Sequence, residues 1–261
     1  MARIAFITDV HADVHALRDA LGQIERLRCE RVICCGDVLD YGLFPVETIA
    51  LLQERGIATV RGNHDRWAIV GGRADEPDAP ENDEPRDATA FDLPRSAVRW
   101  LASLPTSWRM TIDGVRVVVW HASPGSDMQG IYPDSATADE AEGWLAATQA
   151  DVLIVGHTHL SFELRTLGGG MIVNPGALLR DSAEARPVGA MVFDPEVGKF
   201  VPAAVPVGGT FGLLDVSTRQ FTVHRAVDGA GVEIPRKVLG VKDSRVSWDD
   251  PTPVRLPRSR R

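Results

Sequence analysis

The segment RIAFITDVHADVHALRDAL, residues 3–21, joins a strand to a helix and decides the fold class. Its first part, Arg3–Thr8, is a short apolar run rich in β-branched residues, which predicts a strand. Asp13 is a good N-cap for the amphipathic pattern that follows it, so we expect a helix over Asp13–Arg28. A strand that leads directly into a helix is the building unit of α/β proteins.

Two histidines of this segment, His11 and His15, stand four residues apart, as in the helix of zinc proteases. That helix reads H-E-x-x-H, and its Glu acts as the general base. Here Ala12 occupies the Glu position. Because His11 precedes the predicted N-cap and His15 follows it, we expect the two side chains to point in different directions. We therefore set the metalloprotease interpretation aside and keep Asp9 and His11 as a carboxylate and an imidazole at the end of a strand.

Strand and helix patterns alternate through the first two thirds of the chain, which predicts stacked β-α units around a sheet. Further strands are predicted at Arg31–Cys35, Ile57–Val60, Val115–Trp120, Val152–Val155 and Met171–Val173. Further helices are predicted near Pro45–Arg55, Pro94–Ser103 and Thr137–Thr148. Hairpins are predicted around Asp113-Gly114 and between Gly212–Val216 and Phe221–His224.

The composition sets the broad class of the protein. A chain of 261 residues with 44% hydrophobic content suits one globular domain, which we place at residues 1–240. Within it, residues 71–92 are acidic and predict a mobile loop, and the polar residues 241–261 predict a disordered tail. The N-terminus lacks the form of a signal peptide, so we expect a cytoplasmic protein that makes no membrane contact. A net charge of −8 argues against nucleic acid as the main partner.

Several predicted strands are followed at once by side chains that can bind a metal ion. These segments are Asp9-x-His11, Gly36-Asp37-x-x-Asp40, Gly62-Asn63-His64-Asp65, Trp120-His121 and Gly156-His157-x-His159. Loops at the carboxyl ends of strands in an α/β sheet converge on one crevice, so residues far apart in sequence can build one site. Five of the seven histidines lie in these segments, which favours a metal site. We interpret the other two, His15 and His224, as structural or surface residues.

In this order, D-x-H, G-D-x-x-D, G-N-H-[DE], a single His after a strand and G-H-x-H resemble the motif series of the calcineurin-like metallophosphoesterases. The resemblance covers roughly residues 1–176 and is closest to the small bacterial and archaeal phosphoesterases, which carry segments similar to Val60–Asp65, Gly156–His159 and Val173–Gly176. It implies an α/β fold in which a two-sheet β-sandwich is flanked by helices in αββα layers, with the metals at one edge.

The resemblance also implies the roles of the site residues. It gives Asp37 the bridge between two metal ions, with Asp9, His11 and His159 on one ion and Asn63, His121 and His157 on the other. Oxygen and imidazole ligands without a thiolate suit Mn, which we expect, and also Fe, Zn or Ni. Two such ions about 3.5–4 Å apart can hold a phosphate and activate a water molecule for in-line attack.

One motif histidine, His64, is not assigned to a metal. The resemblance implies that it assists the leaving oxygen with a proton or a hydrogen bond. We expect the adjacent Asp65 to keep the imidazole charged, and Asp40 to orient a ligand or the loop backbone.

Two departures from the family pattern narrow the expected activity. Many relatives carry Gly-Asn after D-x-H, whereas this chain has Ala12-Asp13, so we do not expect the phosphate contact that the Asn makes in those relatives. Tyr41 stands where protein Ser/Thr phosphatases carry an Arg that contacts phosphate. The sequence therefore argues against a phosphoprotein phosphatase.

Several activities stay open: a phosphomonoesterase, a phosphodiesterase, or an asymmetrical dinucleoside (diadenosine) tetraphosphate hydrolase. We expect a small phosphorylated substrate, with a nucleotide as one candidate, and we make no prediction of the oligomeric state. A non-catalytic trafficking scaffold of the superfamily would lack ligands or the histidine of G-N-H, and here the motif residues are all in place.

Overall fold

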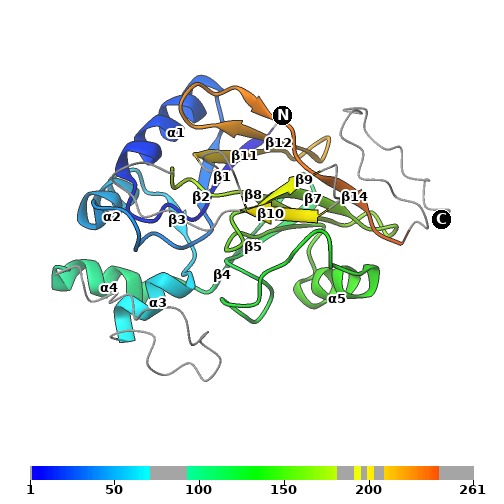
Figure 1. The fold of residues 1–261 in the computed structure, drawn as a ribbon, viewed down its shortest axis with the longest axis horizontal. Helices are drawn as coiled ribbons and strands as arrows, with labels where there is room; N and C mark the ends of the chain where they lie inside the picture. The colour runs from blue at the N-terminus through cyan, green and yellow to red at the C-terminus, as the bar shows by residue number, and fades with distance from the viewer. Residues whose placement is uncertain (1, 71–92, 181–190, 195–198, 203–208, 241–261) are drawn as a thin grey trace.

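The computed structural model describes residues 2–70, 93–180, 191–194, 199–202 and 209–240 (Figure 1). The predicted mobile loop at 71–92 and the predicted tail at 241–261 lie outside the described residues.

In the described residues the strands form two six-stranded mixed sheets and one two-stranded sheet. The first has the order β13-β12-β11-β1-β2-β3, with β1 (Arg3–Ile7), β2 (Arg31–Cys34), β3 (Ala58–Thr59), β11 (Thr210–Asp215), β12 (Gln220–Arg225) and β13 (Gly231–Val232). The second has the order β14-β7-β8-β6-β5-β4, with β4 (Ser107–Ile112), β5 (Val115–Trp120), β6 (Val152–Ile154), β7 (Ser161–Arg165), β8 (Met171–Pro175) and β14 (Arg236–Val238). The small sheet pairs β9 (Met191–Asp194) with β10 (Lys199–Pro202).

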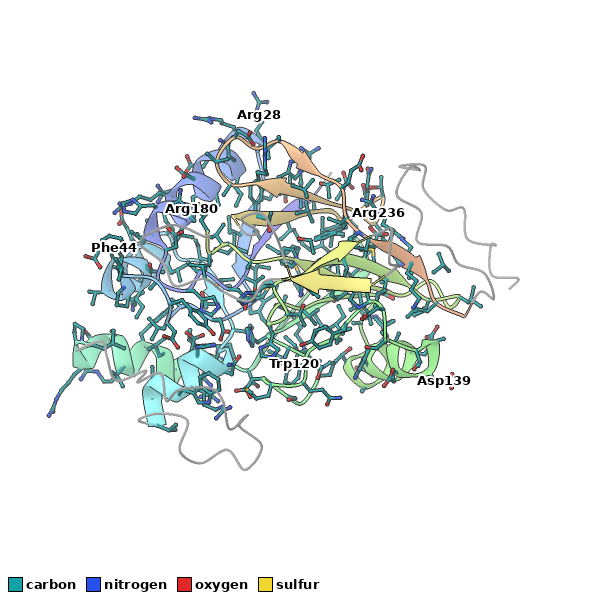
Figure 2. All side chains as sticks on the ribbon, in the orientation of Figure 1. Arg28, Phe44, Trp120, Asp139, Arg180 and Arg236 are labelled. Carbon is teal, nitrogen blue, oxygen red and sulfur yellow. The ribbon has the colours of Figure 1, made fainter. Side chains whose placement is uncertain are left out.

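Successive side chains along a strand point to opposite faces of the sheet. On β1, Ile4 and Phe6 join a core that also contains Val117 and Val173 of the second sheet, so the two sheets pack face to face. Ala5 and Ile7 of β1 instead pack in a second core, which contains buried residues of helices such as Leu17 and Leu101. Side chains fill the space between these layers (Figure 2).

The helices complete the αββα layers. On the first sheet lie α1 (Val14–Arg26), α2 (Pro45–Glu54) and α4 (Arg95–Ser103), and α5 (Ala138–Thr148) covers the second. As predicted, Asp13 caps α1 by accepting a hydrogen bond from the Ala16 N–H. The Asp13 carboxylate also pairs with the Arg180 guanidinium at 3.1 Å, at the start of α1.

The predicted helices and the predicted strands all appear, with ends that differ by a few residues. The helix α3 (Asn63–Val70) differs from prediction, because the G-N-H-D segment was interpreted as a loop and in fact begins a helix at Asn63. Strands β7, β9, β10, β13 and β14 were not predicted. Among the residues described, no helix has the length and apolar character needed to cross a membrane.

Candidate metal centre

The seven predicted ligands gather at one edge of the sandwich. Strands β1, β2 and β3 run parallel in one sheet, and β5, β6 and β8 run parallel in the other. The predicted ligands follow the carboxyl ends of β1, β2, β3, β5 and β6, so each sheet contributes to the same site. Buried side chains are Asp9, His11, Asp37, Asn63 and His121, whereas His157 and His159 are partly exposed.

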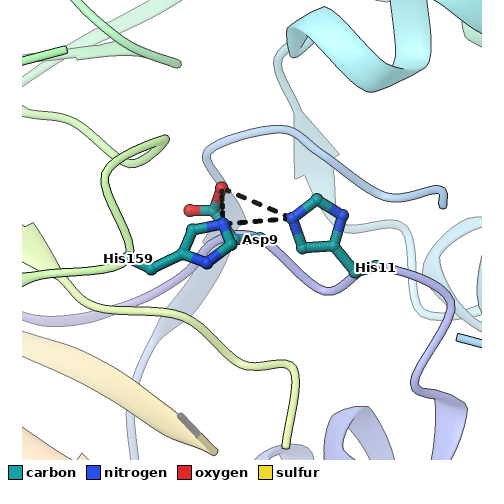
Figure 3. A group of neighbouring side chains, drawn as sticks. All are labelled: Asp9, His11 and His159. Atoms are coloured by element: carbon teal, nitrogen blue, oxygen red, sulfur yellow. Dashed lines mark hydrogen bonds and ion pairs between the residues drawn. The ribbon is translucent and has the colours of Figure 1, made fainter. Parts of the chain in front are cut away.

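One ligand set consists of Asp9, His11 and His159 (Figure 3). The Nε2 atoms of His11 and His159 are 3.2 Å apart, and His159 Nε2 is 3.3 Å from Asp9 Oδ1. Atoms that bind one divalent ion at about 2.0–2.2 Å stand about 3–3.5 Å from one another. These three donors can therefore share one ion.

The two oxygens of the Asp9 carboxylate have different surroundings. Oδ2 accepts hydrogen bonds from the Thr8 hydroxyl at 2.6 Å and from the His157 N–H at 3.0 Å. Oδ1 is buried and accepts no hydrogen bond from the described residues. A buried carboxylate oxygen without a partner is costly, and a cation beside it would remove that cost. Asp9 thus fits a ligand that binds one ion through Oδ1.

The second set is built around the Asn63 side chain. Its Oδ1 lies 3.0 Å from His121 Nε2 and 3.1 Å from His157 Nδ1. Asp37 Oδ2 is 3.2 Å from the same Nε2 atom of His121. Asp37, His121 and His157 form a group whose donor atoms converge, with Asn63 among them.

Asp37 lies between the two sets. Its Oδ2 is 3.2 Å from His121 Nε2 and 3.8 Å from His11 Nε2, so one oxygen approaches a donor of each set. Its other oxygen accepts a hydrogen bond from the His64 N–H at 3.0 Å. This is the position that a bridging ligand requires, because a shared carboxylate oxygen carries negative charge between two cations.

Hydrogen bonds to main-chain carbonyls fix the orientation of two ligand histidines. His11 Nδ1 donates to the Leu39 carbonyl at 2.7 Å, and His121 Nδ1 donates to the Cys35 carbonyl at 2.9 Å. A carbonyl can only accept, so each Nδ1 carries the proton and each Nε2 faces the site.

The charges of the site favour a cation. Burial lowers the pKa of His11 to about 3 and that of His157 to about 4, so both offer neutral lone pairs at pH 7. Burial also opposes charge on His121, yet the Asp37 carboxylate raises its pKa to about 10. A protonated, positively charged His121 is therefore favoured beside the Asp37 carboxylate. A bound metal ion would supply the same positive charge.

Left-handed backbone conformations are concentrated in this site. The φ angles are 51° at Asp9, 48° at His11, 53° at Asp37, 67° at His157 and 58° at His159. Such angles are uncommon outside glycine and cost on the order of 1 kcal/mol or more each. Five of them among seven predicted ligands indicate that the surrounding structure holds these side chains in place against local preference.

His64 belongs to neither proposed set, although its side chain lies close to His11 and Asp37. It lies in the first turn of α3, and its Nδ1 is 2.7 Å from Asp40 Oδ2. Burial would lower the pKa of His64, but the carboxylates of Asp37 and Asp40 raise it above its usual value. The charged imidazole is thus favoured beside the metal ligands.

The predicted contact between Asp65 and the His64 imidazole is wrong. The Asp65 carboxylate accepts hydrogen bonds from the N–H groups of Val38 and Gly62, both at 2.9 Å. Asp65 therefore ties the G-D-x-x-D loop to the G-N-H loop, and Asp40 is the carboxylate that contacts His64.

Two residues near the site were given no role by the sequence. Thr8 donates to Asp9, and the Asn174 side chain donates to the Gly156 carbonyl at 2.8 Å and to Thr158 Oγ1 at 3.1 Å. Asn174 thereby holds the loop that carries His157. The sequence signal that could have identified Asn174 is its position in Val173–Gly176, a segment that resembles the family.

A model described as the calcineurin-like phosphoesterase superfamily domain matches residues 2–197 of the chain. The chain belongs to this superfamily. The match confirms the family that the motifs predicted and places the protein among metal-dependent phosphoesterases.

Related proteins and structures agree with this assignment. Protein MJ0912 of Methanocaldococcus jannaschii is 26% identical over 180 residues, which cover 68% of this chain and 70% of that protein. A crystal structure of a metallophosphoesterase from Sphaerobacter thermophilus is 25% identical, covers 86% of this chain and 87% of that one, and gives a TM-score of 0.57. The hypothetical protein PH1004 from Pyrococcus horikoshii OT3, 17% identical, has the same fold with a TM-score of 0.64, covering 86% of this chain and 88% of its own.

The superfamily fold confirms the predicted two-sheet sandwich flanked by helices. The individual role of each site residue stays a prediction. What the structure adds is their proximity: all seven predicted ligands and His64 lie in one connected cluster.

Proposed function

We propose that the protein hydrolyses a phosphoester bond with two metal ions held by the two ligand sets. The observation that carries this proposal is Asp37 Oδ2, which approaches His121 of one set and His11 of the other. Two bound ions would neutralise the phosphate charge and generate a nucleophile from water at neutral pH. Asp9, His11 and His159 would hold one ion, Asn63, His121 and His157 the other, and Asp37 both.

The donor atoms are carboxylate and amide oxygens and imidazole nitrogens, which suit Mn, Fe, Zn or Ni. Manganese is the metal we propose. The buried cysteines Cys34 and Cys35 pack in the apolar cores, and burial raises the pKa of each thiol, so they offer no thiolate at neutral pH.

His64 would act on the leaving group. Its Nδ1 is engaged by Asp40, which leaves Nε2, 3.9 Å from Asp37 Oδ2, on the side of the ligand sets. With its pKa raised, the imidazole can donate a proton to the departing oxygen. Asp40 is a positioning residue that keeps this proton in place.

Removal of metal is expected to abolish hydrolysis of bis-p-nitrophenyl phosphate, and added Mn²⁺ is expected to restore it. The reason is that water is activated only when the ions are bound. The measurement is the rate after dialysis against a chelator, followed by titration with Mn²⁺. A parallel sample treated with Mg²⁺ controls for ionic strength. Full activity in excess chelator would refute the metal dependence of the reaction.

Asp40→Asn is expected to lower kcat by about 10–100-fold on an alkyl ester, because a charge-assisted hydrogen bond to His64 is lost. Both metals should remain bound. The double variant with His64→Ala should be no slower than His64→Ala alone, since Asp40 acts through that imidazole. An additive loss in the double variant would show that Asp40 has a separate role.

The choice among ester classes is tested by a panel of a monoester, a diester, a 2′,3′-cyclic nucleotide and diadenosine tetraphosphate, each with Mn²⁺. Preferential hydrolysis of diadenosine tetraphosphate would support the asymmetrical hydrolase as the alternative to a general phosphodiesterase.

A further inference from the structure

The chain has two tyrosines, and both lie beside the metal centre. Tyr41 is next to the first ligand set: its ring centroid is 4.6 Å from that of His11. It also lies 5.1 Å from the ring centroid of His64, the proposed acid. An ester group that departs with the help of His64 would therefore pass beside Tyr41.

Tyr132 lies close to His157 of the second ligand set, because the two rings both lie beside Gly130. A Cβ placed on Gly130 would lie 3.1 Å from Tyr132 Cε2 and 3.3 Å from Cδ2 of His157. The same Cβ would meet Thr158 Cγ2 at 2.6 Å, so position 130 accommodates only a glycine beside the His157 loop. Tyr132 is nevertheless 45% exposed, so part of its ring is available to a bound molecule.

The loop that carries Tyr132 is held firmly. Arg66 Nε, in the same helix as His64, donates to Asp127 at 2.7 Å, and the Ser126 hydroxyl accepts from the Met128 and Gln129 N–H groups. Ile131, directly before Tyr132, is 1% exposed and anchors the loop in the core. An exposed aromatic ring on an anchored loop is a preformed surface for a ligand.

These positions divide the phosphate site into two sides. In the proposed reaction the leaving group would lie on the side of His64 and Tyr41, and His157 and Tyr132 would face the rest of the phosphate. A phosphomonoester has no second organic group to place against Tyr132. A phosphodiester does, and a nucleobase is a planar group that stacks well on an aromatic ring.

Building on the function proposed above, we propose that the substrate is a phosphodiester whose retained ester group is a nucleoside, and that Tyr132 recognises its base. The ring supplies a stacking face, while the metals and His64 carry out the hydrolysis. Tyr132 is thus a specificity-determining residue.

Two diesters with the same leaving group test this proposal: thymidine 5′-(p-nitrophenyl) phosphate and methyl p-nitrophenyl phosphate. Both release p-nitrophenolate, so their ratio of kcat/KM reports only on the retained group. The wild-type protein loaded with Mn²⁺ is expected to favour the thymidine ester by about tenfold or more, the range for one base stacked on an aromatic side chain.

Tyr132→Ala should lower this ratio by about tenfold, and Tyr132→Phe, which keeps the ring, should preserve it. Leu167→Ala, an exposed apolar residue in the turn between β7 and β8, is the matched control and should leave the ratio unchanged. Metal content and circular dichroism establish that the Ala variant is folded and loaded; if it is not, the ratio of the wild-type protein on the two diesters decides the proposal.

Three outcomes would overturn the proposal. Equal efficiency of the wild type on the two diesters would refute nucleoside recognition while leaving phosphoester hydrolysis intact. An equal loss of kcat/KM on both diesters in Tyr132→Ala would show that Tyr132 has only a structural role at the site. Failure of the metal-loaded wild type on every phosphoester would refute the proposed function, and the substrate class with it.

Discussion

Asp37→Asn is expected to bind metal weakly and to lose hydrolysis by on the order of 10³-fold or more, because electrostatic stabilisation worth several kcal/mol disappears. Asp37 Oδ2 lies near donors of both ligand sets, so the variant would leave two cations facing an uncharged amide. The shape of the side chain is nearly unchanged, which limits the effect to charge.

The measurement is metal content per chain after gel filtration, together with kcat in saturating Mn²⁺. Asp113→Asn is the matched control: it makes the same chemical change in the β4–β5 turn, where the φ angle of 51° suits asparagine. Two ions bound to Asp37→Asn at wild-type affinity would show that the bridge is placed wrongly.

His64→Ala is expected to retain both metals and to lower kcat by about 10²–10⁴-fold, the usual effect of losing a positioned general acid. His64 Nδ1 is engaged by Asp40, and neither proposed ligand set includes its side chain, although that side chain lies near His11 and Asp37. Metal content and kcat measured on the same preparation separate acid catalysis from metal binding.

The loss should depend on the leaving group. A nitrophenolate departs with little help from a proton, whereas an alkoxide such as a ribose oxygen needs one. The variant should therefore be impaired more on a dinucleotide than on a chromogenic ester. His15→Ala, which removes an exposed histidine of α1 packed against Phe44, should behave as wild type. If His64→Ala slows both ester types equally or binds one metal fewer, the acid role is refuted.

The sequence could predict that the ligand side chains cluster, because the information needed lies in short segments at the ends of strands. The ligands follow strands, and parallel strands end at the same edge of a sheet, so Asp9 and Asp37 had to be close once β1 and β2 were identified. The packing of the two sheets then brings His121 beside Asp37. The family motifs divided the residues into two sets. Both sets have converging donor atoms in the structure, as does a third group of His11, Asp37 and His64, so the assignment of residues to ions stays a prediction.

The contacts between loops could not be predicted in this way. Asp65 is adjacent to His64 in sequence, but α3 begins at Asn63 and directs the Asp65 carboxylate to the Gly62 and Val38 amides. Asp40, which is 24 residues away in sequence, contacts the imidazole instead. The position of Tyr132 likewise depends on packing against Gly130, which no periodic pattern encodes.

Both proposed ions would lie on the seam of the sandwich. In the first set, His159 follows β6 of the second sheet, whereas Asp9 and His11 follow β1 of the first sheet. In the second set, Asn63 follows β3 of the first sheet and His121 follows β5 of the second. Each ion would thus act as a cross-link between the sheets. An ion that binds only the folded chain raises the free energy of unfolding, by about 4 kcal/mol at a free concentration 1,000 times its Kd. The supply of metal would then govern how long the folded molecule persists as well as how fast it turns over substrate.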